Sequence, residues 1–525
     1  MATPKKTKVA KKNKIIATGA SWDFNKIEEA YNVIEKIAIE KYDLDFYPNQ
    51  IEIITAEQML DAYSSVAMPV MYNHWSFGKQ FVRESEAYKR GHMGLAFEVV
   101  INSNPCIAYL MEENTMAMQL LVIAHASIGH NAFFKNNYMF KQWTDASSII
   151  DYLSFAKKYV AECEEKHGHA EVEKILDSCH ALMNYGVFRY KRPKPLSVHE
   201  EKELQRERIR YQQQMYNDLW ETTIPKGRDT FGVSIERFPS EPEENILDFI
   251  EHNAPHLESW KRELIRIVKN VAQYFYPQMH TKVSNEGFAT FIHYTIMNDL
   301  YDEGFIDEGY MLEFLQSHTS VVKQTSFDSK FYSGINPYAL GFAIYQDIRR
   351  ICTNPTDEDR EWFPDFAGNN DWVEIVKWAM SDFKDDSFIQ QFLSPKVMRD
   401  LKLFSVLDDE EDDELEISAI HNTNGYKKVR AALANQYNIS SMLPNIQVYN
   451  VNVRGDRALT LRHYQNNKRP LHPESTLETM KHILQLWEYP VVLESVNPNK
   501  DYSKTRESWE AQFYVDEEKS SSKFS

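Results

Sequence analysis

Apolar side chains recur at three- and four-residue spacing over most of the chain, which is the pattern of amphipathic helices. This periodicity runs from residue 22 to about residue 190 and resumes from residue 244 to about residue 399. A continuous apolar stretch at residues 116–128 is shorter than the roughly 20 residues that cross a bilayer, and it predicts a buried helix. The pattern therefore predicts one large, mostly α-helical domain over residues 21–405.

The pattern changes after residue 414, where apolar and polar residues begin to alternate. Residues 446–453 and 458–464 alternate around Arg454-Gly455-Asp456-Arg457, which predicts a β-hairpin. The neighbouring segments predict a strand at 415–420, helices at 425–436 and from Pro473 to Trp487, and a strand at 490–495. This order, β-α-β-β-α-β, predicts a small α+β ferredoxin-like module over residues 415–496.

Charged segments separate and flank these regions. Six lysines and no acid fall within the first fourteen residues, so residues 1–20 are expected to form a disordered basic tail. A charged connector is expected near residues 191–216, an acidic linker at 406–414 and a C-terminal tail at 497–525.

Charge and cysteine content restrict the partners and the compartment. The net charge is −18, and the chain without its basic tail is still more acidic, which argues against nucleic acid or anionic membrane as the main partner. The four cysteines are widely spaced and do not suggest a disulfide framework. We find neither a membrane span nor the apolar segment of a signal peptide, and therefore expect a cytoplasmic protein.

Two histidines and two acids border the apolar stretch at residues 116–128. Glu112 and Glu113 precede it, and His125 and His130 fall near its end. Burial of a histidine costs free energy unless its ring nitrogens bind a metal or form hydrogen bonds. Because residues five apart on a regular α-helix point about 140° apart, both histidines can reach one ion only if the helix ends or bulges near Gly129.

A second helix also carries ligand-type residues. Glu286 and His293 are seven residues apart, nearly two turns, and therefore share a helix face. The sequence N-E-G-F-A at residues 285–289 resembles the helix that donates the glutamate ligand in gluzincin metallopeptidases. Residues 125–130 faintly resemble their H-E-x-x-H helix, with Ala126 in the position of the general base. Glu112 or Glu113 could take over that catalytic role only if the fold brings one of them back.

These two segments predict a helix pair in which His125 and Glu286 converge. The pair could be a buried hydrogen bond, or it could be a zinc or iron site with His130 or His293 as a further ligand. The candidates for supporting or pocket-lining roles are His74, His280, Asn131 and Tyr294. For His74, a surface or hydrogen-bonded histidine without a metal role is the favoured interpretation, and a ligand is the alternative.

Long segments of the chain resemble the SpoVR (stage V sporulation protein R) family. They include L-D-F-Y-P-N-Q-I-E at residues 44–52, the segments at 74–79, 102–116, 129–137, 285–294, 332–341 and 392–400, and, in the C-terminal region, 417–422 and 454–457. The resemblance implies a cytoplasmic bacterial protein with a role in spore cortex formation or stress, acting with a PrkA-like serine protein kinase and a von Willebrand factor A-domain (VWA) protein. It attaches no reaction to the chain. A regulatory protein is therefore the favoured function, and a metal-dependent hydrolase with a degenerate gluzincin-like site is the alternative.

Overall fold

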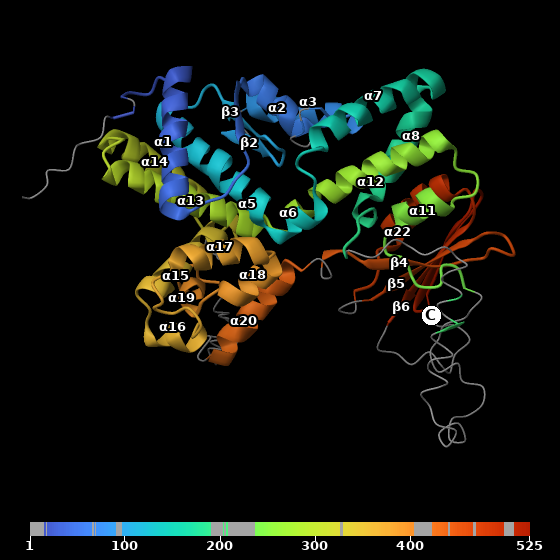
Figure 1. Cartoon of the computed structure of the whole chain (residues 1–525). Coiled ribbons are helices and arrows are strands. Elements are labelled where there is room, and N and C mark those ends of the chain that lie inside the picture. Colours follow the sequence, from blue (N-terminus) through green and yellow to red (C-terminus); the bar gives the residue numbers. More distant parts are fainter. Residues whose placement is uncertain are drawn as a thin grey trace, which may run out of the picture. The chain divides into compact units, whose positions relative to one another are not determined.

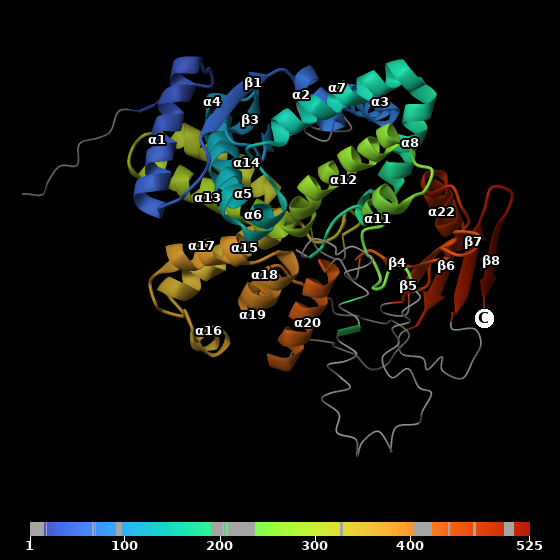
Figure 2. The same cartoon turned by 45° about the vertical axis from the view of Figure 1, so that its right-hand side comes forward.

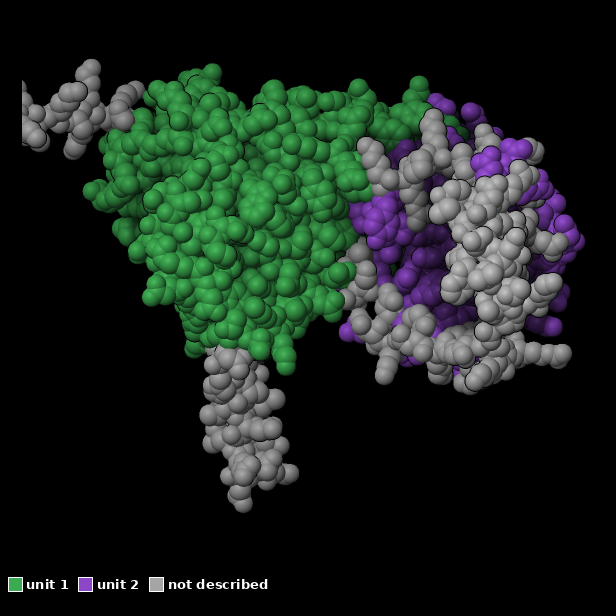
Figure 3. All heavy atoms as spheres, turned by 60° about the horizontal axis from the view of Figure 1, so that its bottom comes forward, with its two compact units in different colours: residues 1–159, 277–438 green, residues 160–276, 439–525 purple. Residues whose placement is uncertain are grey.

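The structure is a computed structural model that describes residues 15–16, 18–65, 68, 70–90, 97–190, 203, 206–207, 237–325, 329–403, 423–438, 442–465, 469–497 and 509–524. Most of the basic tail and of the charged connector, the whole acidic linker and the predicted strand at 415–420 lie outside these residues. The chain divides into two compact units, shown in separate colours in Figure 3. Unit 1 comprises Met1–Tyr159 and Pro277–Asn438, and unit 2 comprises Val160–Tyr276 and Ile439–Ser525.

Helices dominate the described part of the chain, as predicted (Figure 1). Up to residue 190 they are α1 (Phe24–Tyr42), α2 (Ala56–Ser64), α3 (Trp75–Lys89), α4 (Met116–Val122), the π-helix η1 (Ile123–His130), α5 (Asn131–Asn136), α6 (Tyr138–Trp143), α7 (Ile149–His167), α8 (His169–Ala181) and the 3-10 turn η2 (Met183–Tyr185). Those that follow are α11 (Ile246–Asn253), α12 (Ser259–His280), α13 (Lys282–Asp302), α14 (Glu308–Val321), α15 (Pro337–Thr353), α16 (Asp357–Trp362), α17 (Trp372–Asp382), α18 (Asp385–Phe392), α19 (Pro395–Asp400), α20 (Thr423–Gln436) and α22 (Pro473–Trp487).

Helix α13 is the central element of unit 1. It contacts α15, η1, α14 and α1, and most of its side chains are buried. Glycines permit two of these contacts. A Cβ atom on Gly287 would lie 2.4 Å from the backbone of Gly341 in α15, and one on Gly129 would lie 2.6 Å from Cα of Ala289. The backbones of α13, α15 and η1 therefore approach one another more closely than side chains would allow.

Unit 1 also contains a small sheet that the helical periodicity did not predict. It consists of β1 (Asn49–Ile54), β2 (Glu98–Ile101) and β3 (Cys106–Met111) in the order β1-β3-β2. Strand β3 pairs parallel with β1 and antiparallel with β2. The prediction of helix throughout residues 22–190 is wrong here, because short runs of β-branched residues in β1 and β2 favour strands.

Unit 2 contains a five-stranded sheet of β4 (Asn445–Val451), β5 (Leu459–Tyr464), β6 (Val491–Val496), β7 (Ala511–Val515) and β8 (Ser520–Phe524). The predicted hairpin is confirmed as the antiparallel pair β4–β5, and the predicted helix from Pro473 to Trp487 is α22. Helix α22 connects the parallel strands β5 and β6 and packs on one face of the sheet (Figure 2).

The ferredoxin-like arrangement of this module is not confirmed. The described strands lie side by side in chain order, with α22 as the one crossover helix among them. The predicted helix at 425–436 exists as α20, but it belongs to unit 1, where it packs against α18. Strands β7 and β8 occupy part of the region expected to be a C-terminal tail, because alternating buried residues of β7 extend the sheet beyond β6.

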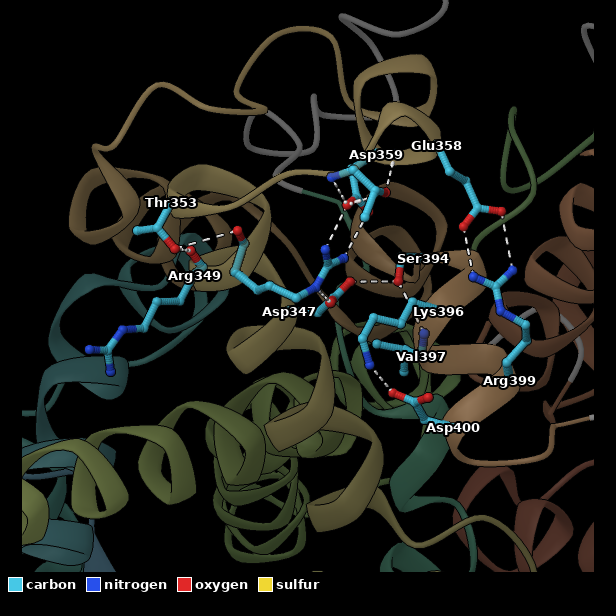
Figure 4. Close-up of polar contacts among 12 residues, drawn as sticks. Asp347, Arg349, Thr353, Glu358, Asp359, Ser394, Lys396, Val397, Arg399 and Asp400 are labelled. Atoms are coloured by element: carbon cyan, nitrogen blue, oxygen red, sulfur yellow. Dashed lines mark hydrogen bonds and ion pairs between the residues drawn. The ribbon is translucent and has the colours of Figure 1, made fainter.

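Two arginine–carboxylate pairs lie in the region of α15, α16 and α19 (Figure 4). Arg350 donates to both oxygens of the buried Asp359 over 2.6 and 2.8 Å and also pairs with Asp347. Arg399 pairs with Glu358 over 2.7 and 3.1 Å, with both side chains about two-fifths exposed. The two pairs have the same chemistry but differ in burial.

Candidate metal centre

The π-helix η1 brings His125 and His130 onto one side of the same helical segment. A π-helix pairs residue i with residue i+5, so side chains five apart lie near one another rather than about 140° apart. The two ring centroids are 4.6 Å apart, and both side chains are buried. The bulge that the spacing required near Gly129 is therefore present, and it extends over all eight residues of η1.

Glu286 of α13 faces these two rings. Its Oε2 atom lies 3.8 Å from Nε2 of His125 and 3.4 Å from Nε2 of His130, so the predicted convergence of His125 and Glu286 is confirmed. These separations exceed the usual 2.7–3.2 Å of an N–H···O hydrogen bond. They are close to the roughly 3.3 Å expected between two ligands that lie about 2.0–2.1 Å from one tetrahedral ion. In the described part of the chain, the buried Oε2 atom has no hydrogen-bond partner.

The other ring nitrogens of both histidines are held from outside the centre. Nδ1 of His130 lies 2.9 Å from Oδ1 of Asn285, and Nδ1 of His125 lies 2.9 Å from Nδ1 of His293. An amide oxygen can only accept, so His130 donates from Nδ1 to Asn285. The Nε2 atoms of both histidines thus face Glu286. His293, predicted as a further ligand, lies behind His125 instead.

A second carboxylate, which sequence reasoning missed, borders the centre. Glu98 opens β2, and its Oε1 atom lies 3.5 Å from Nε2 of His125. The signal in the sequence was an acid directly before the apolar residues of β2, but it required that strand to be recognised. Glu112 and Glu113, the predicted catalytic acids, are exposed in the turn between β3 and α4. Helix α4 separates the turn of Glu112 and Glu113 from η1 in the sequence. After Glu286, Glu98 is the second acid that the fold brings to His125.

Burial and mutual attraction shift the pKa values within the cluster. Burial alone would raise the pKa of Glu286, but His130 and His125 outweigh it and hold that pKa well below its usual range. Burial would lower the pKa of His130, but Glu286 outweighs it and raises that pKa. Burial raises the pKa of Glu98, against the opposing effect of His125 and His130. The attraction between Glu286 and His130 thus favours the charged form of each, and a cation at the centre would replace the proton on Nε2 of His130.

The rings behind His125 are kept neutral. Burial, followed by the proximity of His125 and His318, holds the pKa of His293 well below its ordinary value. Burial, followed by His125, lowers the pKa of His318 to about 4. Both rings are uncharged at neutral pH, and each then carries one N–H donor and one bare nitrogen acceptor.

Two predicted supporting residues have structural roles elsewhere in unit 1. The Asn131 side chain accepts from the backbone N–H of Tyr47 over 2.8 Å and donates to its carbonyl over 2.7 Å. It therefore ties the segment before β1 to α5. His74 caps the N-terminus of α3, where its Nδ1 atom accepts from the backbone N–H of Ser76 over 3.3 Å.

The other two predicted supporting residues flank the centre in sequence. Tyr294 lies next to His293 on α13, and its ring contacts His318, with 5.0 Å between centroids. His280 is buried at the C-terminal end of α12, just before α13. Tyr294 therefore belongs to the surroundings of the histidines behind the centre.

A second cluster of ligand-type residues, in unit 2, already contains its own cation. Asp248, Glu251 and His252 lie close together on α11. Lys269 contacts the carboxylates of both acids over 2.5 Å, and Arg266 pairs with Glu251 over 2.7 Å. These side chains neutralise the acids, whereas the groups that face Glu286 at the first cluster are histidines. The His125 cluster is therefore the better candidate for a metal ion.

Comparison with known proteins shows the family of the chain. Residues 21–442 match the profile described as SpoVR like protein, and residues 444–498 match the SpoVR-like C-terminal domain. An uncharacterized protein of Escherichia coli (strain K12), YcgB, is 58% identical over 482 residues, which cover 92% of this chain and 94% of that protein. No solved structure matches the chain. Among the residues that the structure describes, none of the helices is both long enough and apolar enough to cross a membrane. The chain belongs to the SpoVR family.

Proposed function

We propose that unit 1 binds one divalent metal ion, zinc or iron, through Nε2 of His125, Nε2 of His130 and the carboxylate of Glu286, and uses it for hydrolysis. The observation that carries this proposal is the buried Oε2 atom of Glu286. It lies 3.4 and 3.8 Å from two histidine nitrogens and has no hydrogen-bond partner among the described residues. A shared ion would satisfy this oxygen and both nitrogens together.

The composition of the ligand set indicates a catalytic centre. Structural zinc sites use four protein ligands, whereas catalytic sites use three and keep one position for water or substrate. At this centre, three groups offer ligand atoms within 4.8 Å of one another: His125, His130 and Glu286. A bound zinc ion would supply acidity to a water molecule, whose pKa falls to about 7 in such sites.

Glu98 is the residue that we assign as the proton acceptor for that water. It lies 3.5 Å from Nε2 of His125, next to the three ligands but outside their group. Burial raises its pKa, which makes it a stronger base than an ordinary glutamate. Glu98 would thus be the general base, a role for which position 126 carries an alanine. Glu112 and Glu113 are too exposed to take that role. Peptide or cell-wall-precursor bonds are the substrate classes that we propose.

Elemental analysis of the purified protein tests the metal site. We expect about one equivalent of zinc or iron in the wild-type protein and a loss of at least tenfold in His125→Ala. The matched control is His463→Ala, which removes a buried histidine of β5 that bonds Ser495 in unit 2. A wild-type protein that contains no metal and binds none on titration would refute the proposal. His125 and Glu286 would then form a buried polar pair that only fixes two helices.

The role of Glu98 has its own test. Glu98→Gln keeps the size of the side chain and removes the base, so we expect metal content near that of the wild type. Hydrolysis of a chromogenic probe, p-nitrophenyl acetate, should fall by a factor of about 10²–10⁴ if the wild-type protein cleaves it. Loss of the metal in this variant would instead make Glu98 a fourth ligand. Unchanged hydrolysis would exclude it as the base.

A regulatory role is a second candidate, and the separate unit 2 favours it. All residues of the proposed centre lie in unit 1, while unit 2 has its own sheet and the SpoVR-like C-terminal domain. We propose that unit 2 joins the protein to a PrkA-like serine kinase and a VWA-domain protein in a cytoplasmic complex linked to stress or sporulation. Affinity purification of the full chain, followed by mass spectrometry, should recover both partners. Recovery of neither would refute this role and leave the metal centre unaffected.

A further inference from the structure

Three buried histidines from three helices form a hydrogen-bonded row that begins at the centre. Nδ1 of His125 in η1 lies 2.9 Å from Nδ1 of His293 in α13, and Nε2 of His293 lies 2.9 Å from Nδ1 of His318 in α14. Their exposed fractions are 5%, 4% and 4%. The free end at His125 is the Nε2 atom that faces Glu286. The row thus connects a proposed metal ligand to a helix that supplies none of the ligands.

The row allows only two arrangements of protons when all three rings are neutral. Each contact needs one N–H and one bare nitrogen, and each neutral imidazole carries one of each. If His125 donates from Nδ1, then His293 accepts at Nδ1 and donates from Nε2 to His318. Nε2 of His125 is then bare and can bind a cation. In the reverse arrangement, Nε2 of His125 carries the proton and cannot bind one.

We propose that His293 and His318 are positioning residues that hold His125 in the tautomer whose bare Nε2 faces the metal position. This inference rests on the proposed metal centre. The usual partner of a histidine ligand is a carboxylate or a backbone carbonyl. A second imidazole differs from these because it can both donate and accept. His318 is therefore needed to accept from Nε2 of His293, which leaves Nδ1 of His293 as the acceptor for His125.

The surroundings of His318 fix the far end of the row. Its ring is packed between Phe342, Tyr294 and Phe314, with centroids 4.8, 5.0 and 5.5 Å away. These contacts restrict rotation of the ring and keep Nδ1 directed at His293. Tyr294 therefore contacts the far end of the row through His318.

Reversal of the row conserves the number of protons. In a row that started in the reverse arrangement, a cation bound at Nε2 of His125 would replace the proton on that atom. Protons would then shift from His293 to His125 and from His318 to His293 along the two hydrogen bonds. Nε2 of His318 would take up one proton from solvent, which balances the one released to solvent from Nε2 of His125.

Three variants of the full chain test the inference, with Zn²⁺ as the probe and a chromophoric chelator as the competitor. His293→Leu preserves the bulk of the side chain and removes both hydrogen bonds, and we expect Zn²⁺ affinity to fall by about 10–100-fold. His293→Gln restores an acceptor and a donor, and should recover affinity to within about threefold of the wild type. Thr295→Val, two residues away, removes a hydroxyl that bonds only its own helix and should leave affinity unchanged.

Two further measurements separate positioning from packing. His318→Phe suits the aromatic surroundings and removes the acceptor, so its Zn²⁺ affinity should also fall, even if His293→Leu fails to fold. In ¹⁵N-histidine-labelled, zinc-loaded protein, NMR should show His125 protonated at Nδ1 and His293 at Nε2. Wild-type Zn²⁺ affinity in His293→Leu and His318→Phe, or a proton on Nδ1 of His293, would overturn the inference alone. A wild-type protein that binds no Zn²⁺ would overturn the proposed metal centre as well.

Discussion

Replacement of Gly287 by alanine tests whether the close contact between α13 and α15 holds Glu286 in place. A Cβ atom at this position would lie 2.4 Å from both Cα and the carbonyl carbon of Gly341. Carbon atoms in contact are normally 3.5–4.0 Å apart, so the overlap exceeds about 1 Å. The neighbour is backbone rather than a flexible side chain, and a rotamer change cannot relieve the overlap. The two helices must therefore separate.

The magnitude follows from two opposing effects. Gly→Ala inside a helix gains about 1 kcal/mol from helix propensity, while overpacking of a close-packed contact costs about 1–3 kcal/mol. Gly78 in α3 supplies the matched control, because no atom lies within 4 Å of a Cβ built there. Gly78→Ala should therefore stabilise its helix by about 0.5–1 kcal/mol. Gly287→Ala should be less stable than Gly78→Ala by the full packing cost.

Hydrogen exchange at the amides of α13 and α3 measures the local stability of each helix. Differential scanning calorimetry measures the loss of stability of unit 1. Exchange should quicken in α13 of Gly287→Ala and slow in α3 of Gly78→Ala. Because Glu286 is the preceding residue, Gly287→Ala should also bind Zn²⁺ at least tenfold more weakly, given the placement within about 0.5 Å that functional sites need. If both glycines gave equal stabilisation, with Zn²⁺ binding intact, the close contact would not constrain the centre.

Three further predictions concern charge and metal. Arg350→Met should destabilise unit 1 by about 3 kcal/mol because it leaves Asp359 buried without its cation. Arg399→Met, at the exposed pair, should cost at most about 1 kcal/mol. Similar losses of stability for the two variants in urea unfolding would contradict the prediction. Burial raises the pKa of Asp385 from 3.8 to about 7, although its carboxylate accepts hydrogen bonds from backbone N–H groups of α13, which lower that pKa. The folded protein therefore holds a proton that the unfolded chain releases, so stability falls by up to about 1.4 kcal/mol per pH unit as pH rises between these values; Asp385→Asn should remove this part of the slope in urea unfolding between pH 4 and 7. Zn²⁺ at a hundredfold excess over its dissociation constant should stabilise the wild type by about 2.7 kcal/mol and raise its melting temperature. Glu286→Gln should show no such rise, and a rise equal to that of the wild type would refute the prediction.

The sequence predicted those parts of the fold that depend on local pattern. Helix α22 and the β4–β5 hairpin follow from apolar spacing and turn residues that lie next to one another in the chain. The three-stranded sheet was missed because its strands are only four to six residues long and lie between stronger helical segments. Glu98 was missed with it, since its approach to His125 depends on the pairing of β2 with β3 and not on any feature near residue 98.

The convergence of His125 and Glu286 was predictable because each puts a polar group on an otherwise apolar helix, and an unpartnered group costs about 2–7 kcal/mol on burial. The same reasoning explains η1. In a regular α-helix His130 would point about 140° from His125 and away from Glu286, so one histidine would be buried without a partner. The π-helix turns both histidines toward Glu286 and so avoids burial of an unpartnered histidine. Its hydrogen-bond geometry is rare in proteins, and many of its occurrences are at functional sites. Gly129 lets this irregular turn lie directly on the backbone at Ala289. Apolar residues at both positions would allow regular α-helical geometry here, whereas η1 turns two buried histidines toward Glu286. This arrangement is the one that a ligand between the three side chains would need.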